Sequence, residues 1–335
     1  MHDKILLSHG EGGKRTRELI AKVIARYFDN PVLAPFLDSG LLGRIDGEIA
    51  FTTDGYVVTP PFFPGGDIGR LAVCGTVNDL AVCGAKPVAI SCGLILEEGL
   101  PMDTLERALA AMRDAAKEAG VAIACGDTKV VERGKGDGIF ITTAGVGVSV
   151  DGWRPAPSEI RPGDRILLTG TMGDHQVAVL IARQNLAISA PVLSDVAPLG
   201  GLLLPLLPRF AGKVRFMRDP TRGGVGVTLN EMASAANARF VLDEARLPVR
   251  ESVRGVCEIL GFDPLYLANE GKAVLIVAGD AAEAIVAALR EHPYGREAAI
   301  IGEVQEGGSG VRMRTLAGGV RAVDYPVGDQ LPRIC

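Results

Sequence analysis

Apolar residues follow two different periods along the first half of this chain. Short apolar runs of strand length alternate with segments in which apolar residues recur every three to four positions, as on one face of a helix. The segment 103–119 places Leu105, Ala108 and Met112 on one side and is followed by Gly120, a residue suited to a helix C-terminus. The pattern predicts helices over 16–28, 68–84 and 103–119, and strands over 49–53, 87–96, 121–125 and 139–150.

The second half repeats this alternation after a polar stretch at 155–164 that contains three prolines and reads as a linker. We therefore expect an α/β (α+β) protein with two domains, residues 1–155 and 156–320, and a flexible tail over 321–335. The pattern predicts strands over 165–169, 274–277, 299–304, 311–315 and 320–325, and helices that end near 184, 207, 236 and 292.

Composition narrows the class of protein. At 335 residues and 47% hydrophobic content the chain can bury a core in each of two domains. A net charge of −5 with no basic segment argues against nucleic-acid binding. None of the six cysteines forms a C-x-x-C pair, which argues against structural zinc. With no signal-peptide pattern and no apolar run long enough to span a bilayer, we expect a cytoplasmic protein.

Acidic residues stand at the ends of predicted elements or in apolar surroundings. Asp54 follows a strand, Asp79 lies beside Asn78 among apolar residues of a helix, and Asp127 follows another strand together with Thr128 and Lys129. Oxygen ligands with few histidines are typical of Mg²⁺ held together with nucleotide phosphates. Asp219, before Pro220, is either a fourth ligand or a helix cap. Whether Asp38 joins this site stays open.

Two further segments carry candidate chemistry. Gly12 and Gly13 belong to a glycine-rich loop before a helix, where backbone N–H groups can approach a phosphate, although the spacing is not that of a Walker A loop and a plain turn is equally compatible. Glu270 and Lys272 are either an exposed pair of little energetic value or a base with its charge partner. His175 is expected to be structural.

The chain ends in Pro332-Arg333-Ile334-Cys335. A thiol on a terminal tail can enter one site and be presented to another protein, and an extended tail of this length reaches roughly 50 Å. Chain ends are also often frayed, so position alone does not separate these readings.

Together these segments resemble the HypE family of hydrogenase maturation factors, within the aminoimidazole ribonucleotide (AIR) synthetase-like or PurM-like superfamily. The resemblance covers nearly the whole chain and includes residues 9–13, 51–54, 62–67, 74–84, 126–132, 218–224, 269–272 and the terminal Pro-Arg-Ile-Cys. One departure is Gln176, which follows Gly173-Asp174-His175 where the family usually has glycine.

The resemblance implies an ATP-dependent carbamoyl dehydratase with a two-domain PurM-like fold that forms a homodimer through its first domain. In the family, HypF carbamoylates the terminal cysteine, here Cys335, and the protein converts the thiocarbamate to a thiocyanate. The cyano group then passes to iron on the HypC–HypD complex for the [NiFe]-hydrogenase.

The resemblance also implies roles for individual residues, taken from their positions in the matching motifs. Asp54, Asp79, Asp127 and Asp219 would hold Mg²⁺, and Gly12, Gly13, Asp54, Asn78, Asp79, Asp127, Thr128 and Lys129 would contact ATP. Lys129 would also stabilise the transferred phosphoryl group, and Glu270 is the candidate base, although the sequence does not fix the base, the number of Mg²⁺ ions or the resting position of the tail.

Two alternatives stay open. An ATP-dependent synthase acting on a free small molecule would keep its activity without Cys335. A non-enzymatic scaffold that presents its tail would bind ATP without releasing ADP from the carbamoylated chain.

Overall fold

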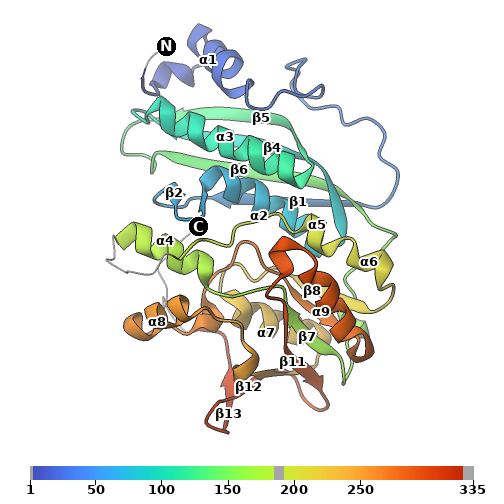
Figure 1. Ribbon diagram of the computed structural model, residues 1–335. Helices are drawn as coiled ribbons and strands as arrows, with labels where there is room; N and C mark the ends of the chain where they lie inside the picture. The colour runs from blue at the N-terminus through green and yellow to red at the C-terminus, as the bar shows by residue number, and fades with distance from the viewer. Residues whose placement is uncertain (1–2, 185–191, 327–335) are drawn as a thin grey trace.

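The structure, a computed structural model, describes residues 3–184 and 192–326. It contains a four-stranded and a seven-stranded sheet, each with helices, stacked along the long axis of the molecule (Figure 1). This confirms the predicted α/β (α+β) class with two domains. The first sheet ends at Ser149 and the second begins at Arg165, so the predicted division at 155–156 lies between them. Within the two described ranges, no helix has the length and apolar character needed to cross a bilayer.

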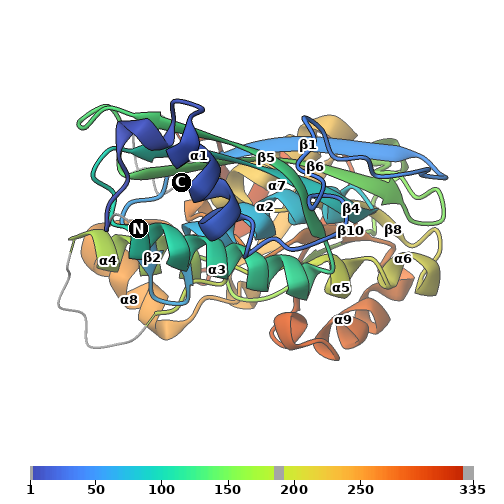
Figure 2. The same ribbon diagram turned by 90° about the horizontal axis from the view of Figure 1, so that it is seen from above.

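The N-terminal sheet has the strand order β1-β6-β4-β5, and β4 and β5 are its parallel pair. Its helices α2 and α3 contact each other, and α2 lies against β1, β6 and β4. The N-terminal segment contacts β5 and α3 (Figure 2). The strands are β1 (Ile49–Tyr56), β2 (Phe62–Phe63), β3 (Gly66–Asp67), β4 (Ala85–Glu97), β5 (Ala122–Val131) and β6 (Ile139–Ser149); the helices are α1 (Lys14–Leu19), α2 (Ile68–Val82) and α3 (Met102–Ala119).

Helix α2 is buried along almost its whole length because three layers surround it. It contacts the first sheet on one side, α3 on another, and α5 and β8 of the second domain at its C-terminal part. Its N-terminus is capped by Asp67, whose carboxylate accepts a hydrogen bond from the Arg70 N–H at 2.9 Å. A polar side chain on this helix therefore faces either another element or a cavity.

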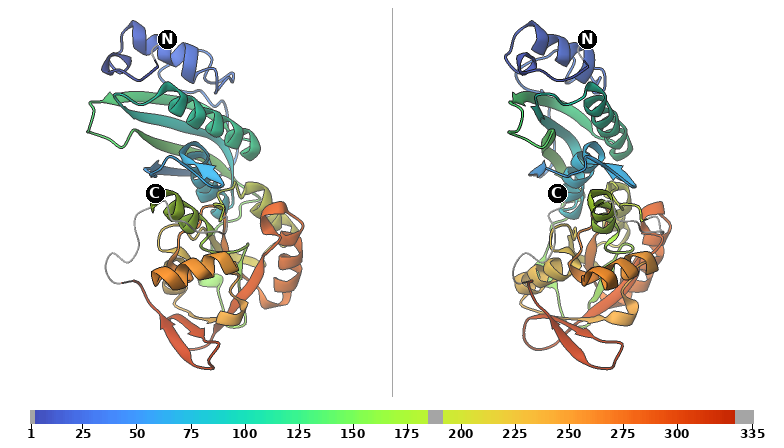
Figure 3. Two further views of the ribbon diagram at one scale, coloured as in Figure 1. Left: turned by 60° about the vertical axis from the view of Figure 1, so that its left-hand side comes forward. Right: turned by 90° about the vertical axis from the view of Figure 1, so that its left-hand side faces the viewer.

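The C-terminal domain is built on a mixed sheet of order β13-β12-β9-β11-β7-β10-β8, in which only β12 and β9 pair in parallel. The β12–β13 hairpin lies at the end of the molecule remote from the first domain (Figure 3). The strands are β7 (Arg165–Leu168), β8 (Val214–Arg218), β9 (Arg239–Asp243), β10 (Val274–Val277), β11 (Ala299–Gln305), β12 (Gly310–Arg314) and β13 (Val320–Val323); the helices are α4 (Asp174–Gln184), α5 (Gly200–Leu203), α6 (Leu206–Arg209), α7 (Gly224–Ala236), α8 (Glu251–Leu260) and α9 (Ala282–Arg290).

Several predicted boundaries are corrected. The helix expected over 16–28 is the six-residue α1 followed by a π-helix at Ile20–Ile24. Residues 321–323, assigned to the tail, belong to β13 and pair with β12, so the ordered domain extends further than expected. Strands β8 and β9 and helix α8 were not predicted, because the two strands carry arginines inside short apolar runs and α8 is short and follows a proline-containing loop.

Candidate active site

A cavity of about 660 Å³ lies between the two domains. The first domain lines it with Asp54 and Asp79, and the second domain lines it with Asp219 and Glu270. These four carboxyl groups come from four separate segments of the chain. The fold therefore collects acidic residues that are up to 216 positions apart, from Asp54 to Glu270, around one space.

The alternation of strand β1 explains how Asp54 and Asp79 meet. Even-numbered residues of β1 face α2, so Thr52 reaches the helix and donates a hydrogen bond to Asp79 Oδ2 at 2.8 Å. Asp54 follows two positions later on the same side of the strand and accepts from the Gly55 N–H at 2.7 Å. Asp79 is half-buried, as a carboxylate at the mouth of a helix-lined cavity would be.

Asp219 and Glu270 are fixed by backbone pairing in the second domain. Asp219 follows the last residue of β8, and the next carbonyl, that of Pro220, accepts hydrogen bonds from the Asn269 N–H and from Asn269 Nδ2 at 3.1 and 3.0 Å. The Asn269 side chain also accepts from the Gly173 N–H at 2.8 Å. These contacts tie the segment before Glu270 to the segment after β8.

Burial and mutual repulsion raise the pKa of three of these carboxyl groups. For Asp219 burial and the charge of Asp79 raise the pKa to about 7. For Glu270, which is only 6% exposed, burial is the main cause and the charges of Asp219, Asp195, Asp54 and Asp79 add to it, so its pKa lies well above the usual range. Burial also raises the pKa of Asp79, against the hydrogen bond from Thr52. A cation placed among these groups would relieve the repulsion.

The donor set fits a magnesium ion that shares its ligands with phosphate. The acidic side chains around the cavity are oxygen donors, as Mg²⁺ prefers, and the ion commonly keeps water or substrate oxygens in its shell. Among the residues described, no three carboxylate, imidazole or thiol groups lie close enough to hold a metal by themselves. The remaining ligands would have to come from water or from a bound nucleotide.

Asp127 does not join the other three predicted metal ligands within one chain. Together with Thr128, Lys129, Gly12 and Asp38 it lines a second cavity of about 340 Å³ beside the N-terminal segment. Its carboxylate pairs with Lys129 Nζ at 2.8 Å, and the hydrogen bond from Lys129 lowers the pKa of Asp127. In the isolated chain Asp127 and Lys129 thus line a different cavity from Asp54, Asp79 and Asp219, and the four-aspartate metal site stays a prediction.

Asn78 and Gly13 also lie outside both cavities. Asn78 is buried, and its Nδ2 donates to the carbonyls of Ala197 and Glu270 while its Oδ1 accepts from the Leu199 N–H. With both amide hydrogens in use, the side chain joins the two domains rather than reaching a nucleotide. Gly13 is the N-terminal cap residue of α1 and borders a shallow surface hollow with Lys14.

Glu270 and Lys272 are not an exposed pair, which corrects that alternative. Both are buried, and Lys272 Nζ pairs with Asp195 Oδ2 at 3.2 Å on the side away from the carboxylate cavity. His175 is buried and contacts Ser194 Oγ at 2.8 Å through Nδ1, and burial lowers its pKa to about 4. Both observations agree with a structural role for His175.

Cys335 lies outside the described residues, but the point from which its segment departs is fixed. Tyr266, which lines the carboxylate cavity, donates its hydroxyl hydrogen to the Asp324 carbonyl at 2.7 Å. Asn230 Nδ2 donates to the Val323 carbonyl at 2.7 Å, and Arg321 pairs with Asp263 at 2.6 Å. The chain therefore leaves the last strand beside Tyr266, a residue that lines the cavity.

Sequence reasoning missed several residues of this site. Thr52 and Gln176 line or support the cavity, and Arg218 lines it while pairing with Glu231 at 2.9 Å. Gln176 Oε1 accepts from the Ala268 N–H at 2.7 Å, two residues before Glu270. Alternation along β1 could have identified Thr52, since it shares a face with Asp54. Nothing in the sequence pairs Gln176 with Ala268.

Comparison with known proteins defines the class first. Family models described as AIR synthase related protein, N-terminal domain and C-terminal domain match residues 37–149 and 161–314. These two modules, joined in one chain around an interdomain acidic cavity, make this an AIR synthase-related protein.

Full-length relatives then identify the family within that class. The carbamoyl dehydratase HypE of Cupriavidus necator is 51% identical over 334 residues, covering 99% of this chain and 95% of the relative. A crystal structure of HypE in complex with ATP matches with a TM-score of 0.94 at 48% identity and covers 98% of this chain and 99% of that one. A HypE–HypF complex matches with a TM-score of 0.81 at 46% identity, covering 92% and 99%. The chain belongs to the HypE family of carbamoyl dehydratases, enzymes of hydrogenase maturation.

Proposed function

We propose that the protein uses ATP to dehydrate an S-carbamoyl group on its own Cys335 to a thiocyanate, which supplies the cyanide ligand of [NiFe]-hydrogenase iron. The observation that supports this proposal is that the chain after the last strand is held by Tyr266, a residue that lines the same cavity as Glu270. From Asp324 to Cys335 an extended chain spans at most about 40 Å, enough to return to the cavity. Tethering of this kind replaces a bimolecular encounter with an oriented one.

The chemistry is balanced by transfer of one phosphoryl group. The carbamoyl oxygen attacks the γ-phosphorus and releases ADP, so that a C–O–P linkage forms and one N–H proton is lost. Cleavage of the C–O bond then releases phosphate, and loss of the second N–H proton completes the S–C≡N group. The net change is loss of water from the thiocarbamate coupled to hydrolysis of ATP. Phosphoryl transfer of this type depends mainly on positioning and charge neutralisation.

We assign the metal site to the cavity lined by Asp54, Asp79 and Asp219, where water or nucleotide phosphate oxygens would complete the shell that these carboxylates do not form by themselves. Mg²⁺ bound there would neutralise phosphate charge, and its presence would favour the ionised form of Glu270 as the base for the N–H protons. Gly12, Gly13, Asp127, Thr128 and Lys129 are proposed to contact ATP, with Lys129 directed to the phosphoryl oxygens.

A homodimer would allow the two cavities to act together. The face of the N-terminal sheet opposite α2 carries exposed Ile49 and Phe51, and their β6 partners Val148 and Val146 continue this apolar surface. Exposed apolar patches of this kind mark association surfaces. We propose that a second copy docks here and presents its Asp127 and Lys129 to the carboxylate cavity of its partner. HypF as carbamoyl donor and HypC–HypD as acceptor complete the proposal.

The test is the intact mass of the full chain after incubation with HypF, carbamoyl phosphate, ATP and Mg²⁺, beside a Cys335→Ala variant. The expected result is a carbamoyl adduct that loses the mass of one water with release of ADP, only when Cys335 is present. ATP binding without loss of water would favour a scaffold. Nucleotide turnover with a free small molecule that persists in Cys335→Ala would favour a synthase.

A further inference from the structure

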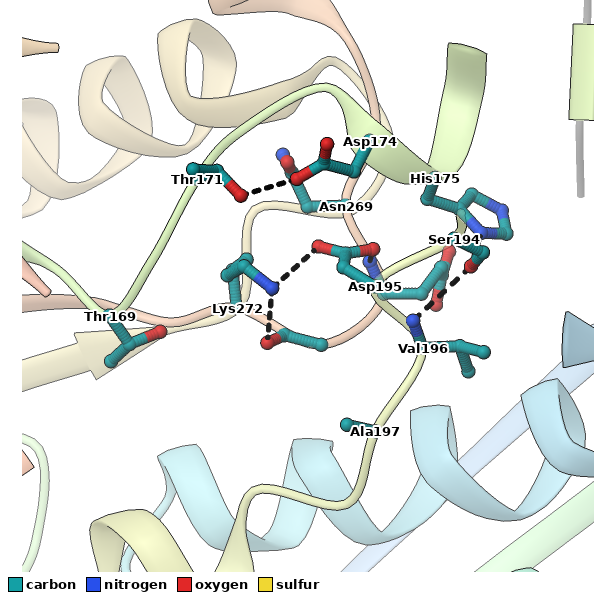
Figure 4. Close-up of polar contacts among 12 residues, drawn as sticks. Thr169, Thr171, Asp174, His175, Ser194, Asp195, Val196, Ala197, Asn269 and Lys272 are labelled. Carbon is teal, nitrogen blue, oxygen red and sulfur yellow. Dashed lines mark hydrogen bonds and ion pairs between the residues drawn. The ribbon is translucent and has the colours of Figure 1, made fainter. Parts of the chain in front are cut away.

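A single segment, residues 268–272, separates two cavities. Ala268 and Glu270 line the carboxylate cavity of about 660 Å³, whereas Lys272 lines another of about 360 Å³ that Asp195 also borders. The position of Glu270 therefore depends on the contacts that hold this segment from the side of the second cavity. Figure 4 shows the side chains that do so.

Asp195 holds the segment 268–272 through both of its carboxylate oxygens. Its Oδ1 accepts the backbone N–H of Glu270 at 3.1 Å. Its Oδ2 pairs with Lys272 Nζ at 3.2 Å (Figure 4). Lys272 Nζ also donates to the Gly271 carbonyl at 3.2 Å, which closes a ring of contacts around the peptide that follows Glu270. The Asp195 side chain is only 3% exposed, so water competes little for these bonds.

The backbone carbonyl of Glu270 is held by a side chain from the first domain. Asn78 Nδ2 donates to the Glu270 carbonyl at 3.1 Å, so the N–H and the C=O of this one residue are bound by side chains from two different segments. Gly271 allows the close approach, because a Cβ at that position would overlap the Asp195 carbonyl oxygen. The backbone of Glu270 is thus fixed before any ligand enters.

Fixing the backbone of Glu270 opposes an electrostatic repulsion that acts on its side chain. The Glu270 side chain faces the carboxyl groups of Asp54, Asp79 and Asp219 in the same cavity, and their charges repel it when it ionises, as does the charge of Asp195 behind the segment. A backbone free to shift would move the carboxyl group away from the reacting nitrogen. Displacement of a reacting group by about 1 Å can cost about 100-fold in rate.

We propose that Asp195 is a positioning residue, which keeps Glu270 aimed into the carboxylate cavity by holding its N–H while Lys272 fixes the orientation of the Asp195 carboxylate. This inference rests on the proposed role of Glu270 as the base. Asp195 touches neither substrate nor nucleotide in this scheme, and it acts through the backbone of Glu270.

The isosteric variant Asp195→Asn separates this role from packing. Its amide oxygen will turn toward the Lys272 ammonium, because an N–H facing that cation is repelled, and its NH₂ group then faces the Glu270 N–H. In the double variant Asp195→Asn/Lys272→Gln the amide NH₂ can donate to the glutamine oxygen, so the amide oxygen returns to the Glu270 N–H. The two variants share the same altered residue at 195 and differ in whether Glu270 is held.

Ser194→Ala is the matched control. Ser194 Oγ contacts His175 and accepts from the Val196 N–H at 3.2 Å, so its removal perturbs the same segment without touching Glu270 (Figure 4). It should lower thermal stability by an amount similar to Asp195→Asn while leaving dehydration within about twofold of the unaltered chain, since the position of Glu270 is unchanged.

The experiment measures single-turnover dehydration of the HypF-carbamoylated full chain, together with the dissociation constant of a non-hydrolysable ATP analogue. We expect Asp195→Asn to slow dehydration at least about tenfold with analogue affinity changed less than about twofold, and the double variant to recover to within about threefold. Equal rates for Asp195→Asn and the unaltered chain would overturn the inference, as would a double variant no faster than the single one. Failure of the unaltered carbamoylated chain to dehydrate would instead reject the proposed function.

Discussion

Protons and a divalent cation compete for Asp219. Burial and the neighbouring Asp79 raise its pKa from the usual 3.8 to about 7, so below neutral pH the side chain is protonated and cannot bind a metal. Above pH 7 it is ionised and available. Metal affinity should therefore increase as the pH rises from 5 to 8, in the range where ordinary aspartates are already fully ionised.

The size of this change in Mg²⁺ affinity follows from the single proton that Asp219 must lose before it binds the metal. Well below the pKa of Asp219 the apparent affinity for Mg²⁺ should fall about tenfold for each pH step of one, so that about 50-fold is lost between pH 7, where half of the carboxyl groups are ionised, and pH 5. Asp219→Asn mimics the protonated, neutral form at every pH. The unaltered chain should thus bind Mg²⁺ far more tightly than this variant at pH 8, and the two should converge near pH 5.

The assay is calorimetric titration of Mg²⁺ into each chain with a saturating non-hydrolysable ATP analogue, from pH 5 to pH 8. The titration of the nucleotide phosphates is common to both chains and cancels in the ratio of affinities. Asp103→Asn, an exposed change on α3, is the control and should leave that ratio near one. A ratio between the unaltered chain and Asp219→Asn that stays constant with pH would refute the reasoning.

The same shift acts with opposite sign on the metal-free protein. An acid whose pKa is raised by folding favours the folded state in its protonated form, so this contribution to stability is lost as the pH rises from 3.8 to about 7. The difference corresponds to at most about 4 kcal/mol. Without metal at pH 8, Asp219→Asn should therefore unfold at a higher temperature than the unaltered chain, and an unchanged or lower unfolding temperature would contradict the repulsion argument.

Two further predictions concern the domain contact and the dimer. Asn78→Ala leaves the Leu199 N–H and the Ala197 and Glu270 carbonyls without their partner in a buried contact. It should therefore lower the free energy of unfolding, measured by denaturant titration, by about 2–5 kcal/mol. A loss below about 1 kcal/mol would mean that the amide is not important for this contact. If each active site combines Asp219 of one protomer with Asp127 of its partner, Asp127→Asn and Asp219→Asn chains, each inactive alone, should recover about a quarter of the unaltered activity after subunit exchange at equal amounts. No recovery after exchange confirmed by mass would place each site within one chain.

The hydrophobic pattern predicted most of the first domain because its elements are long and regular. Helix α3 alternates apolar and polar faces and stops at Gly120, which adopts the left-handed conformation expected of a helix-ending glycine. Strands β8 and β9 gave a weaker pattern because they are short and carry Arg215, Arg218 and Arg239 within or at the end of an apolar run. Arg215 and Arg218 are tolerated because Glu159 and Glu231, elsewhere in the chain, pair with their charges. Such partners are invisible in a local window.

The amino-acid sequence by itself determined which residues are available for chemistry and which family they resemble: the motifs around Asp54, Asp79, Asp219 and Glu270, and the terminal cysteine. Only the tertiary structure decided which of them meet. It separated Asp127 and Lys129 from the carboxylate cavity, placed Asn78 in the contact between domains, and turned Lys272 toward Asp195. The physical reason is that sequence spacing fixes the side of a strand or helix on which a residue lies, whereas the burial of the apolar faces of both domains fixes which sides come together.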